Sequence, residues 1–181
     1  EYGRPPVPDA RQGVEPCGFV VLGMGKLGGR ELNFSSDVDL QYLHVSDEGE
    51  TEGGPGPDGS RRLTSDAFFA KLAELITSAM GQITEEGFVF RTDLRLRPHG
   101  KSGKITNSLR GAELYYGSWG DTWERAALIK ARPVAGDRDL GKQFLERVAP
   151  FVYREYLDFT AIEEIQRMKT RLEQERTSTR G

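Results

Sequence analysis

Apolar residues in the first part of the chain recur with two different spacings, which predict strands as well as helices. A short apolar run bounded by glycine, or an alternation of apolar and polar residues, is typical of a strand. Apolar residues at every third or fourth position indicate a helix with one buried face. These patterns predict strands at residues 18–22, 37–45, 88–96 and 105–107, and helices at residues 26–34 and 64–84.

The strand predicted at residues 37–45 has two unlike faces. Successive side chains of a strand point in opposite directions, so Leu40 and Tyr42 share one face. Asp37 and Asp39 share the other face. We therefore expect one side of this strand to pack on the core and the other to present two neighbouring carboxylates.

From residue 109 onward the pattern is helical, and Ser108 is a suitable N-cap for the first of these helices. The predicted helices are residues 109–119, 121–131, 137–148 and 159–174. Strands followed by helices, without a regular βαβ ladder, indicate the α+β class. The expected architecture is a small mixed β-sheet flanked by helices and followed by a helical section.

Composition divides the chain into three parts. Residues 1–17 are rich in proline and predict a linker or lead-in, residues 18–108 form a core that contains the predicted strands, and residues 109–181 form the helical section. Within the core, residues 46–60 are mostly glycine, proline and acidic residues, which predicts a mobile surface loop. We expect the chain to be a domain of a longer polypeptide.

Size and charge exclude several classes of protein. A chain of 181 residues can bury a core without disulfides, and its single cysteine fits a reducing, cytoplasmic compartment. No apolar run approaches the roughly 20 residues of a membrane span. The net charge of −3, from 25 basic and 28 acidic residues, does not favour nucleic-acid binding. Local clusters of basic residues instead indicate small anionic ligands such as phosphates.

Two motifs lie next to each other after the first predicted strand. The spacing Gly23-x-Gly25-x-x-Gly28 is that of a dinucleotide-binding turn. That interpretation requires a full helix before the next strand, whereas the segment up to Asp37 is short and is interrupted by Asn33 and two serines. The glycines alone therefore favour a dinucleotide site only weakly.

The second motif, Asp37-x-Asp39, predicts a metal site. Two ionised carboxylates on one strand face repel each other unless a cation lies between them, and oxygen ligands of this kind suit Mg²⁺. Asp93, in the predicted strand 88–96, can supply a third carboxylate. Arg91, Arg95 and Arg97 alternate with it and are expected to share its face, and guanidinium groups beside a metal suit a nucleotide polyphosphate. An isolated Asp-x-Asp is commonly a surface feature, so the combination of these residues carries the interpretation.

The order of glycine turn, serine pair, Asp-x-Asp and a later lone aspartate resembles the polymerase-β-like nucleotidyltransferase superfamily. Longer segments resemble the bifunctional glutamine synthetase adenylyltransferase/adenylyl-removing enzymes (the glutamate–ammonia-ligase adenylyltransferases). They are GMGKLGGRELNFSSDVDL, FVFRTDLRLRPHGKSG, WERAALIKARPVAGD and FVYREYLDFTAIEEIQRMK. The ELNFSSD wording and residues 149–159 are more similar to the amino-terminal, adenylyl-removing domain of that family.

The resemblance implies roles for individual residues. Asp37 and Asp39 would bind two Mg²⁺ ions, with Asp93 as the third ligand and Mn²⁺ as an alternative metal. All other implied site residues would contact phosphate or nucleotide, namely Gly28, Gly29, Ser35, Ser36, Arg95, Arg97, Lys130 and Arg132. The family continues past the end of this chain, so the helical section is expected to be truncated at its carboxyl end.

The resemblance also implies a function in the regulation of nitrogen assimilation in the cytoplasm. The expected reaction removes AMP from an adenylyl-tyrosine of glutamine synthetase by phosphorolysis and gives ADP. The adenylylating half-reaction, which uses ATP, is the first alternative. A non-catalytic regulatory module that binds nucleotide is an alternative of another class. A PII-type signalling protein is an expected partner through the full-length enzyme, and neither nucleic acid nor a membrane is expected.

Overall fold

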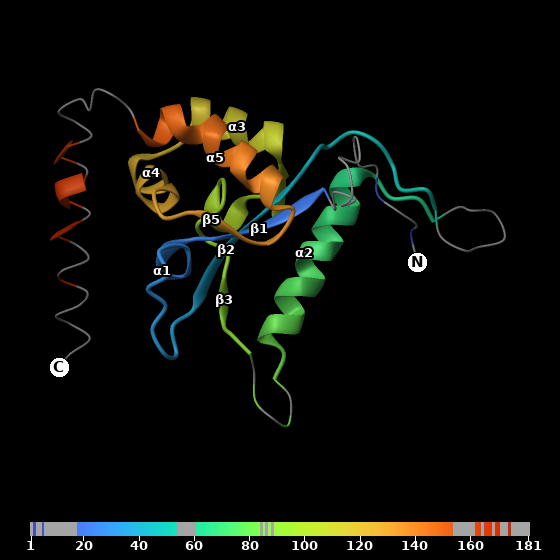
Figure 1. Cartoon of the computed structure of the whole chain (residues 1–181), viewed down its shortest axis with the longest axis horizontal. Helices are drawn as coiled ribbons and strands as arrows, with labels where there is room; N and C mark the ends of the chain where they lie inside the picture. Colours follow the sequence, from blue (N-terminus) through green and yellow to red (C-terminus); the bar gives the residue numbers. More distant parts are fainter. Residues whose placement is uncertain are drawn as a thin grey trace.

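The computed structural model describes residues 2, 5, 18–53, 61–83, 85, 87, 89–153, 162, 163, 165–167, 169, 170 and 174. Most of the predicted lead-in, residues 54–60 of the predicted loop and half of the helix expected at residues 159–174 therefore lie outside the described residues. The remainder is a small mixed sheet with helices on both faces (Figure 1). The predicted α+β class is confirmed.

The sheet is built around one antiparallel pair. Strand β1 (Phe19–Gly23) pairs with β2 (Val38–His44) and, on its other edge, with β5 (Arg132–Gly136), both antiparallel. The free edge of β2 carries two short parallel partners. Strand β3 (Thr92–Asp93) pairs with the beginning of β2, and β4 (Thr106–Ser108) pairs with its end.

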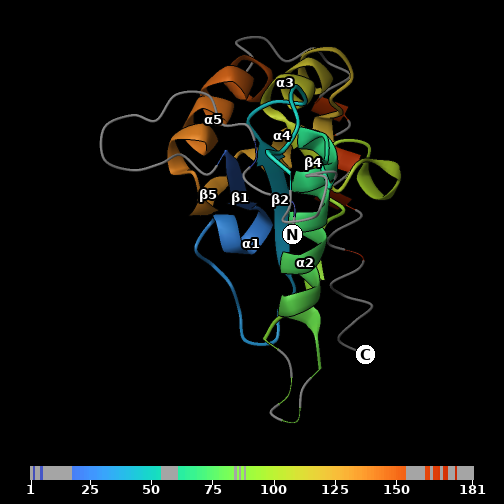
Figure 2. The ribbon, with the colours of Figure 1, turned by 90° about the vertical axis from the view of Figure 1, so that its right-hand side faces the viewer.

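Helices cover the two faces of this sheet (Figure 2). Helix α2 (Ser65–Gly81) packs on one face, where alternate residues of β1 and β2, including Phe19, Val21 and Tyr42, meet Phe69. The opposite face packs against three helices, α3 (Leu109–Ser118), α4 (Thr122–Leu128) and α5 (Arg138–Val152). Both faces of β1 are thus buried, which explains why its sequence is a continuous apolar run.

Several predictions of local structure are confirmed. Strands β1, β2 and β4 and helices α2, α3 and α5 lie where the pattern places them. The side chain of Ser108 accepts a hydrogen bond from the backbone N–H of Gly111, as an N-cap does. Asp121 and Glu124 form a capping box at the start of α4, which satisfies donors that a helix leaves unpaired at its amino end.

Other predictions are wrong in extent or in kind. The helix expected at residues 26–34 is a single turn, α1 (Gly25–Gly28), and the strand expected at 88–96 is reduced to the two residues of β3. The chain from 109 onward is not helical throughout, because β5 interrupts it. The helix expected at residues 64–84 ends at Gly81, and Ile83 after it is 80% exposed.

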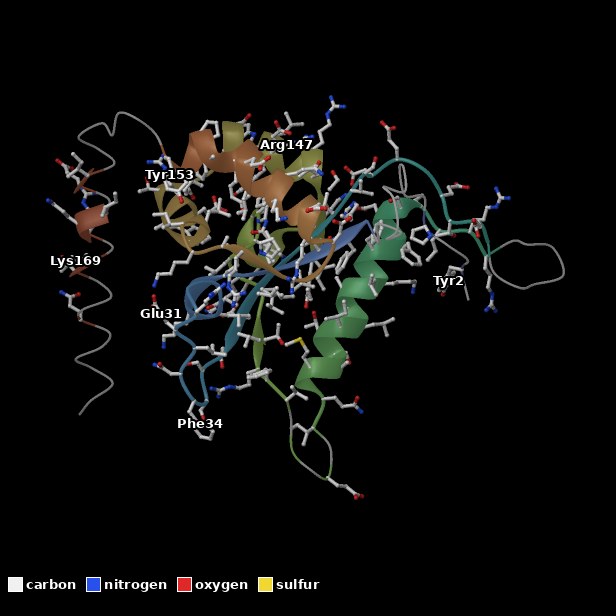
Figure 3. The ribbon with its side chains drawn as sticks, viewed as in Figure 1. Tyr2, Glu31, Phe34, Arg147, Tyr153 and Lys169 are labelled. Atoms are coloured by element: carbon white, nitrogen blue, oxygen red, sulfur yellow. The ribbon has the colours of Figure 1, made fainter. Side chains whose placement is uncertain are left out.

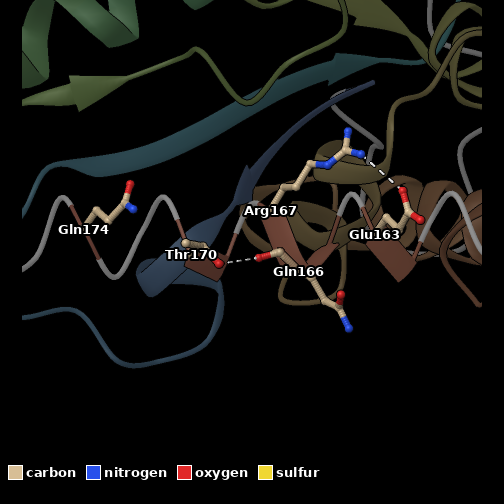
Figure 4. Close-up of a pocket in the computed structure, with 5 residues that line it drawn as sticks. All are labelled: Glu163, Gln166, Arg167, Thr170 and Gln174. Carbon is tan, nitrogen blue, oxygen red and sulfur yellow. Dashed lines mark hydrogen bonds and ion pairs between the residues drawn. The ribbon is translucent and has the colours of Figure 1, made fainter.

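All of the described residues from 162 to 174 have helical backbone (Figure 4). Arg167 pairs with Glu163 at 3.2 Å, and the hydroxyl of Thr170 donates to the carbonyl of Gln166 at 3.0 Å. Both contacts join residues four positions apart, as a helix requires. Among the helices that the structure describes, none has the length and apolar character of a membrane span.

Candidate active site

The parallel pairing of β2 with β3 places two of the three predicted aspartates side by side. Asp39 is the register partner of Asp93, and Val38 is the partner of Thr92. The backbone N–H of Val38 also bonds to the carbonyl of Arg91 at 2.8 Å, which extends the pairing by one residue. Asp37 precedes the pair directly. Residues far apart in sequence are therefore brought together at one end of one strand.

Two of the three aspartates, Asp37 and Asp93, each pair with an arginine. Arg91 Nε lies 2.7 Å from Asp37 Oδ1, and Arg95 Nε donates to both carboxylate oxygens of Asp93 at 3.0 and 2.7 Å. The hydrogen bond from Arg95 lowers the pKa of Asp93. Arg91 and Arg95 are themselves about two-thirds exposed, so both guanidinium groups remain accessible to a ligand.

Asp39 differs from its two neighbours. Burial raises the pKa of its carboxyl group, and the negative charges of Asp93 and Asp37 raise it further. Arg95 and Lys26 oppose this effect but do not outweigh it. A half-buried carboxylate with two negative neighbours is a group whose charged form a cation would stabilise.

The glycines before the aspartates explain how Asp39 is accommodated. A Cβ atom on Gly25 would lie 2.4 Å from Asp39 Oδ2, and Gly25 has a φ of +49°, a conformation that other residues avoid. A Cβ atom on Gly28 would lie 2.2 Å from the carbonyl oxygen of Lys130. The glycine spacing therefore serves close packing around the carboxylate.

A dinucleotide fold is excluded by topology. That fold joins two parallel strands through a full helix, so that the helix amino end faces the pyrophosphate. Here β1 and β2 are antiparallel, and α1 has four residues. The glycine turn and the aspartates belong to one site and not to two competing ones.

Ser35 and Ser36, expected to contact phosphate, lie in the turn that leads into β2. Ser35 has a φ of +62°, its carbonyl accepts a hydrogen bond from Arg91 at 3.0 Å, and Ser36 N–H bonds to the carbonyl of Asn33 at 3.1 Å. Both serines line a pocket of about 370 Å³ together with Phe34 and Phe90. The turn is thus held in one conformation beside Asp37.

The other predicted phosphate ligands have backbone or acidic partners in this structure. Lys130 Nζ lies 2.8 Å from Glu31 Oε2 and passes close to Gly29. Arg132 donates to the carbonyls of Gly28 and Leu27 at 2.9 and 3.1 Å, which fixes the end of α1. These geometries do not test a role in phosphate binding, which stays a prediction.

Arg97 is bound by its own loop. Its guanidinium donates to four backbone carbonyls of residues 94–104, and burial lowers its pKa. It does not share a strand face with Asp93, because the strand ends at Asp93. Arg97 therefore shapes the segment that follows β3, whereas Arg95 remains free to turn toward a ligand.

A second group of possible metal ligands lies at the other end of β2. Among the described residues, His44, Asp47 and Asp66 place ligand atoms within 4.8 Å of one another. His44 is fully buried, and its ring nitrogens bond to Thr106 Oγ1 at 3.2 Å and to Asp47 Oδ1 at 3.3 Å. Asp66 pairs with Lys104 at 3.0 Å. The group could hold a metal, and its members also satisfy one another without one.

Sequence reasoning missed Lys26, and it expected Arg91 on the face of Asp93 without predicting that Asp37 is its partner. Lys26 contributes positive charge to Asp39, and Arg91 is the direct partner of Asp37. The position of Lys26 beside the glycine turn gave a usable signal, since a basic residue there reaches the next strand. The role of Arg91 depends on where β3 begins, and the sequence pattern placed the beginning of this strand too early.

Comparison with known proteins identifies the family. Residues 3–147 match the family described as glutamate-ammonia ligase adenylyltransferase. The chain belongs to the glutamate-ammonia ligase adenylyltransferase family. Relatives named bifunctional glutamine synthetase adenylyltransferase/adenylyl-removing enzyme include those of Pseudomonas aeruginosa, 48% identical over 93% of this chain, and Hahella chejuensis, 48% identical over 87%. The resemblance stated from the sequence motifs is confirmed, and members of this family are enzymes that transfer adenylyl groups.

The chain is much shorter than these adenylyltransferases. The matched region spans 16% of the length of the relatives from Pseudomonas aeruginosa, Hahella chejuensis and Nitrosococcus oceani. The activity named for a whole relative therefore reaches this chain only as a proposal.

Proposed function

We propose that this chain is a metal-dependent nucleotidyltransferase domain that removes AMP from an adenylyl-tyrosine of glutamine synthetase. In this reaction an oxygen of inorganic phosphate attacks the phosphorus of the adenylyl group. The bond from that phosphorus to the tyrosine oxygen breaks, so ADP forms and the tyrosine hydroxyl is regenerated. The pairing of Asp39 with Asp93, directly beside Asp37, is the observation that carries this proposal.

The three aspartates fit Mg²⁺, with Mn²⁺ as an alternative. They offer only hard oxygen donors, and the pKa of Asp39 is raised by burial and further by the negative charges of Asp93 and Asp37, which a divalent cation would offset. Asp37 and Asp39 would hold two ions, with Asp93 as the third ligand. When bound, such ions neutralise charge on the attacking and leaving oxygens of an in-line displacement.

The residues around the aspartates would position the phosphate groups. Arg95 is exposed and can exchange Asp93 for a phosphate oxygen, since a guanidinium binds either group in the same forked geometry. The backbone around Gly28 and Gly29, and the hydroxyls of Ser35 and Ser36, would contact phosphate from the side of the turn. Most of the catalysis would then come from positioning and charge neutralisation.

The choice of the removing reaction rests on the sequence wording ELNFSSD and on residues 149–159, because both activities appear in the names of the relatives. Within a longer enzyme, regulation by a PII-type signalling protein and a cytoplasmic location follow from the same resemblance. The PII-type partner and the cytoplasmic location are therefore part of the proposal.

A direct assay tests the proposal. The purified chain is incubated with adenylylated glutamine synthetase, phosphate and Mg²⁺, and the release of ADP is measured. ADP that depends on phosphate, Mg²⁺ and Asp39 supports the removing reaction. Transfer of labelled adenylate from ATP to unmodified glutamine synthetase, without phosphorolysis, would assign the adenylylating half-reaction instead. Nucleotide binding without either transfer would favour the alternative that the chain is a non-catalytic regulatory module.

A further inference from the structure

A pocket of about 370 Å³ adjoins the aspartate site. One wall comes from the turn at residues 33–36 and the other from residues 89–91, the two segments that lead into β2 and β3. Arg91 lines this pocket and also pairs with Asp37 at 2.7 Å. A molecule in the pocket would therefore lie next to the carboxylates that we assign to metal binding.

The pocket is lined by apolar side chains that remain exposed. Phe34 is 100% exposed, Val89 is 65% exposed and Phe90 is 40% exposed. Phe34 projects from the end of its turn, away from the sheet (Figure 3). Burying a phenylalanine side chain contributes about 2 kcal/mol, so an exposed aromatic wall beside a site is a favourable surface for a planar apolar group.

The turn is held so that Phe34 stays outward. Ser35 adopts a φ of +62°, which is unfavourable for a residue with a side chain, and Arg91 secures its carbonyl at 3.0 Å. Asn33 and Ser36 add an amide and a hydroxyl to the lining. Two aromatic rings with a few polar groups form the surroundings that a purine base needs for stacking and for hydrogen bonds at its edge.

We propose that this pocket binds the adenine base of the adenylyl group, with the ring against Phe34 and Phe90. The nucleotide would then run from the pocket past Arg91 and Ser36, so that its phosphates reach Asp37 and Asp39. The volume suits one nucleoside and is small for a folded protein segment. This inference rests on the proposed function and specifies which part of the substrate the domain recognises.

Calorimetry on the whole chain separates the base from the phosphates. The ligands are ADP and inorganic pyrophosphate, each with Mg²⁺, and the proteins are wild type, Phe34→Ala and Trp119→Ala. Trp119 is a matched control because it is a large aromatic residue, 75% exposed, at the end of α3. Stacking of a base on an aromatic side chain predicts roughly tenfold weaker ADP binding for Phe34→Ala, with pyrophosphate binding unchanged. Trp119→Ala should bind both ligands as wild type does.

The remaining outcomes overturn the inference in different ways. Equal ADP affinity for wild type and Phe34→Ala, or no ADP binding by wild type, would exclude a base in this pocket. Equal ADP affinity together with a raised KM for adenylylated glutamine synthetase would assign the pocket to the polypeptide of the substrate. Loss of ADP affinity in Phe34→Ala, in a chain that shows no phosphorolysis, would instead refute the proposed function and retain the base site.

Discussion

Carboxylate groups gather at both ends of strand β2, but their surroundings differ. At its beginning, Asp39 pairs in register with Asp93 and lies beside Asp37, and the carboxylates of Asp37 and Asp93 contact exposed arginines. At its end, His44 is fully buried against Phe69 and bonded through both ring nitrogens. Each end receives a short parallel partner strand, so the architecture of the two ends is alike.

The difference lies in how well the polar groups satisfy one another. Carboxylates crowd together at the beginning of β2, and the pKa of Asp39 is raised by burial and by its neighbours. At the end of β2, Asp47 accepts from Ser108 and from His44, and Asp66 is paired with Lys104. Unrelieved negative charge marks a place prepared for a cation, whereas a closed hydrogen-bond network stabilises the fold.

The largest expected effect comes from Asp39→Asn. Removing one ligand of the proposed metal site should lower the rate of the proposed AMP removal at least about 100-fold, because ligand loss weakens both metal binding and phosphate positioning. The fold should tolerate the change, since neutralising a carboxylate whose pKa is raised relieves repulsion at neutral pH. Phosphorolysis assays and thermal melts together check both expectations.

Asp139→Asn provides the control for this substitution. Asp139 is an exposed carboxylate of α5 that pairs with Lys142 at 3.1 Å, and it lies outside the proposed catalytic site. Its replacement should leave the rate unchanged. Equal losses of activity in the two variants would mean that the aspartates at the beginning of β2 have no special role.

The second expected effect concerns the glycine turn. A methyl group at Gly25 would collide with Asp39 Oδ2, and its φ of +49° is unfavourable for alanine. Gly25→Ala should lower the free energy of unfolding by about 2 kcal/mol and should also reduce activity, because Asp39 must move. Gly117→Ala in α3 is the matched control.

In contrast to Gly25, a Cβ atom on Gly117 meets no atom within 4 Å, and the residue is helical. Alanine there should stabilise the chain by roughly 0.5–1 kcal/mol, because glycine is a poor helix former. Chemical denaturation measures both changes. A Gly25→Ala variant as stable and as active as wild type would show that the turn does not hold the carboxylate.

Sequence reasoning was most successful where one local rule decided the structure. The alternation of β2, the cap at Ser108 and the aspartate pair all depend on residues within a few positions of one another. The family motifs then linked Asp93 to Asp37 and Asp39 across more than 50 residues, which no periodicity could do.

Failures occurred where distant contacts overrode local pattern. Residues 89–91 alternate as a strand does, yet β3 begins only at Thr92, where β2 offers an edge. Strand β5 contains Pro133 and Gly136, which argue against a strand, but the free edge of β1 recruits it. The network around His44 was likewise hidden, because it joins β2, the following loop and β4.

The third expected effect concerns the end of β2, where the polar groups are hydrogen-bonded to one another. The hydroxyl of Ser108 accepts from Gly111 N–H at 3.1 Å and donates to Asp47. Ser108→Ala should therefore lower the free energy of unfolding by about 1–2 kcal/mol, through loss of an N-cap and of one partner of Asp47. Activity per folded molecule should stay unchanged, which distinguishes this end from the aspartate end. Ser108→Thr, which keeps the hydroxyl, should recover most of the lost stability in urea titrations.

The smallest effect is a pH dependence of opposite sign at the two ends. Burial lowers the pKa of His44 below 6.5, so the unfolded chain takes up a proton first and stability falls as the pH drops below about 6.5. The pKa of Asp39 is raised above 3.8, so the folded chain takes up its proton first and gains stability as the pH falls through that raised value.

Unfolding titrations between pH 7.5 and 4.5 on wild type, His44→Gln and Asp39→Asn isolate these two terms. Relative to wild type, His44→Gln should lose less stability on mild acidification, because it has no ring to protonate. Asp39→Asn should lack the gain that wild type shows at the acidic end. Parallel curves for all three proteins would mean that the ends of β2 differ in shape but not in electrostatics, and the contrast between a cation site and a closed network would lose its physical basis.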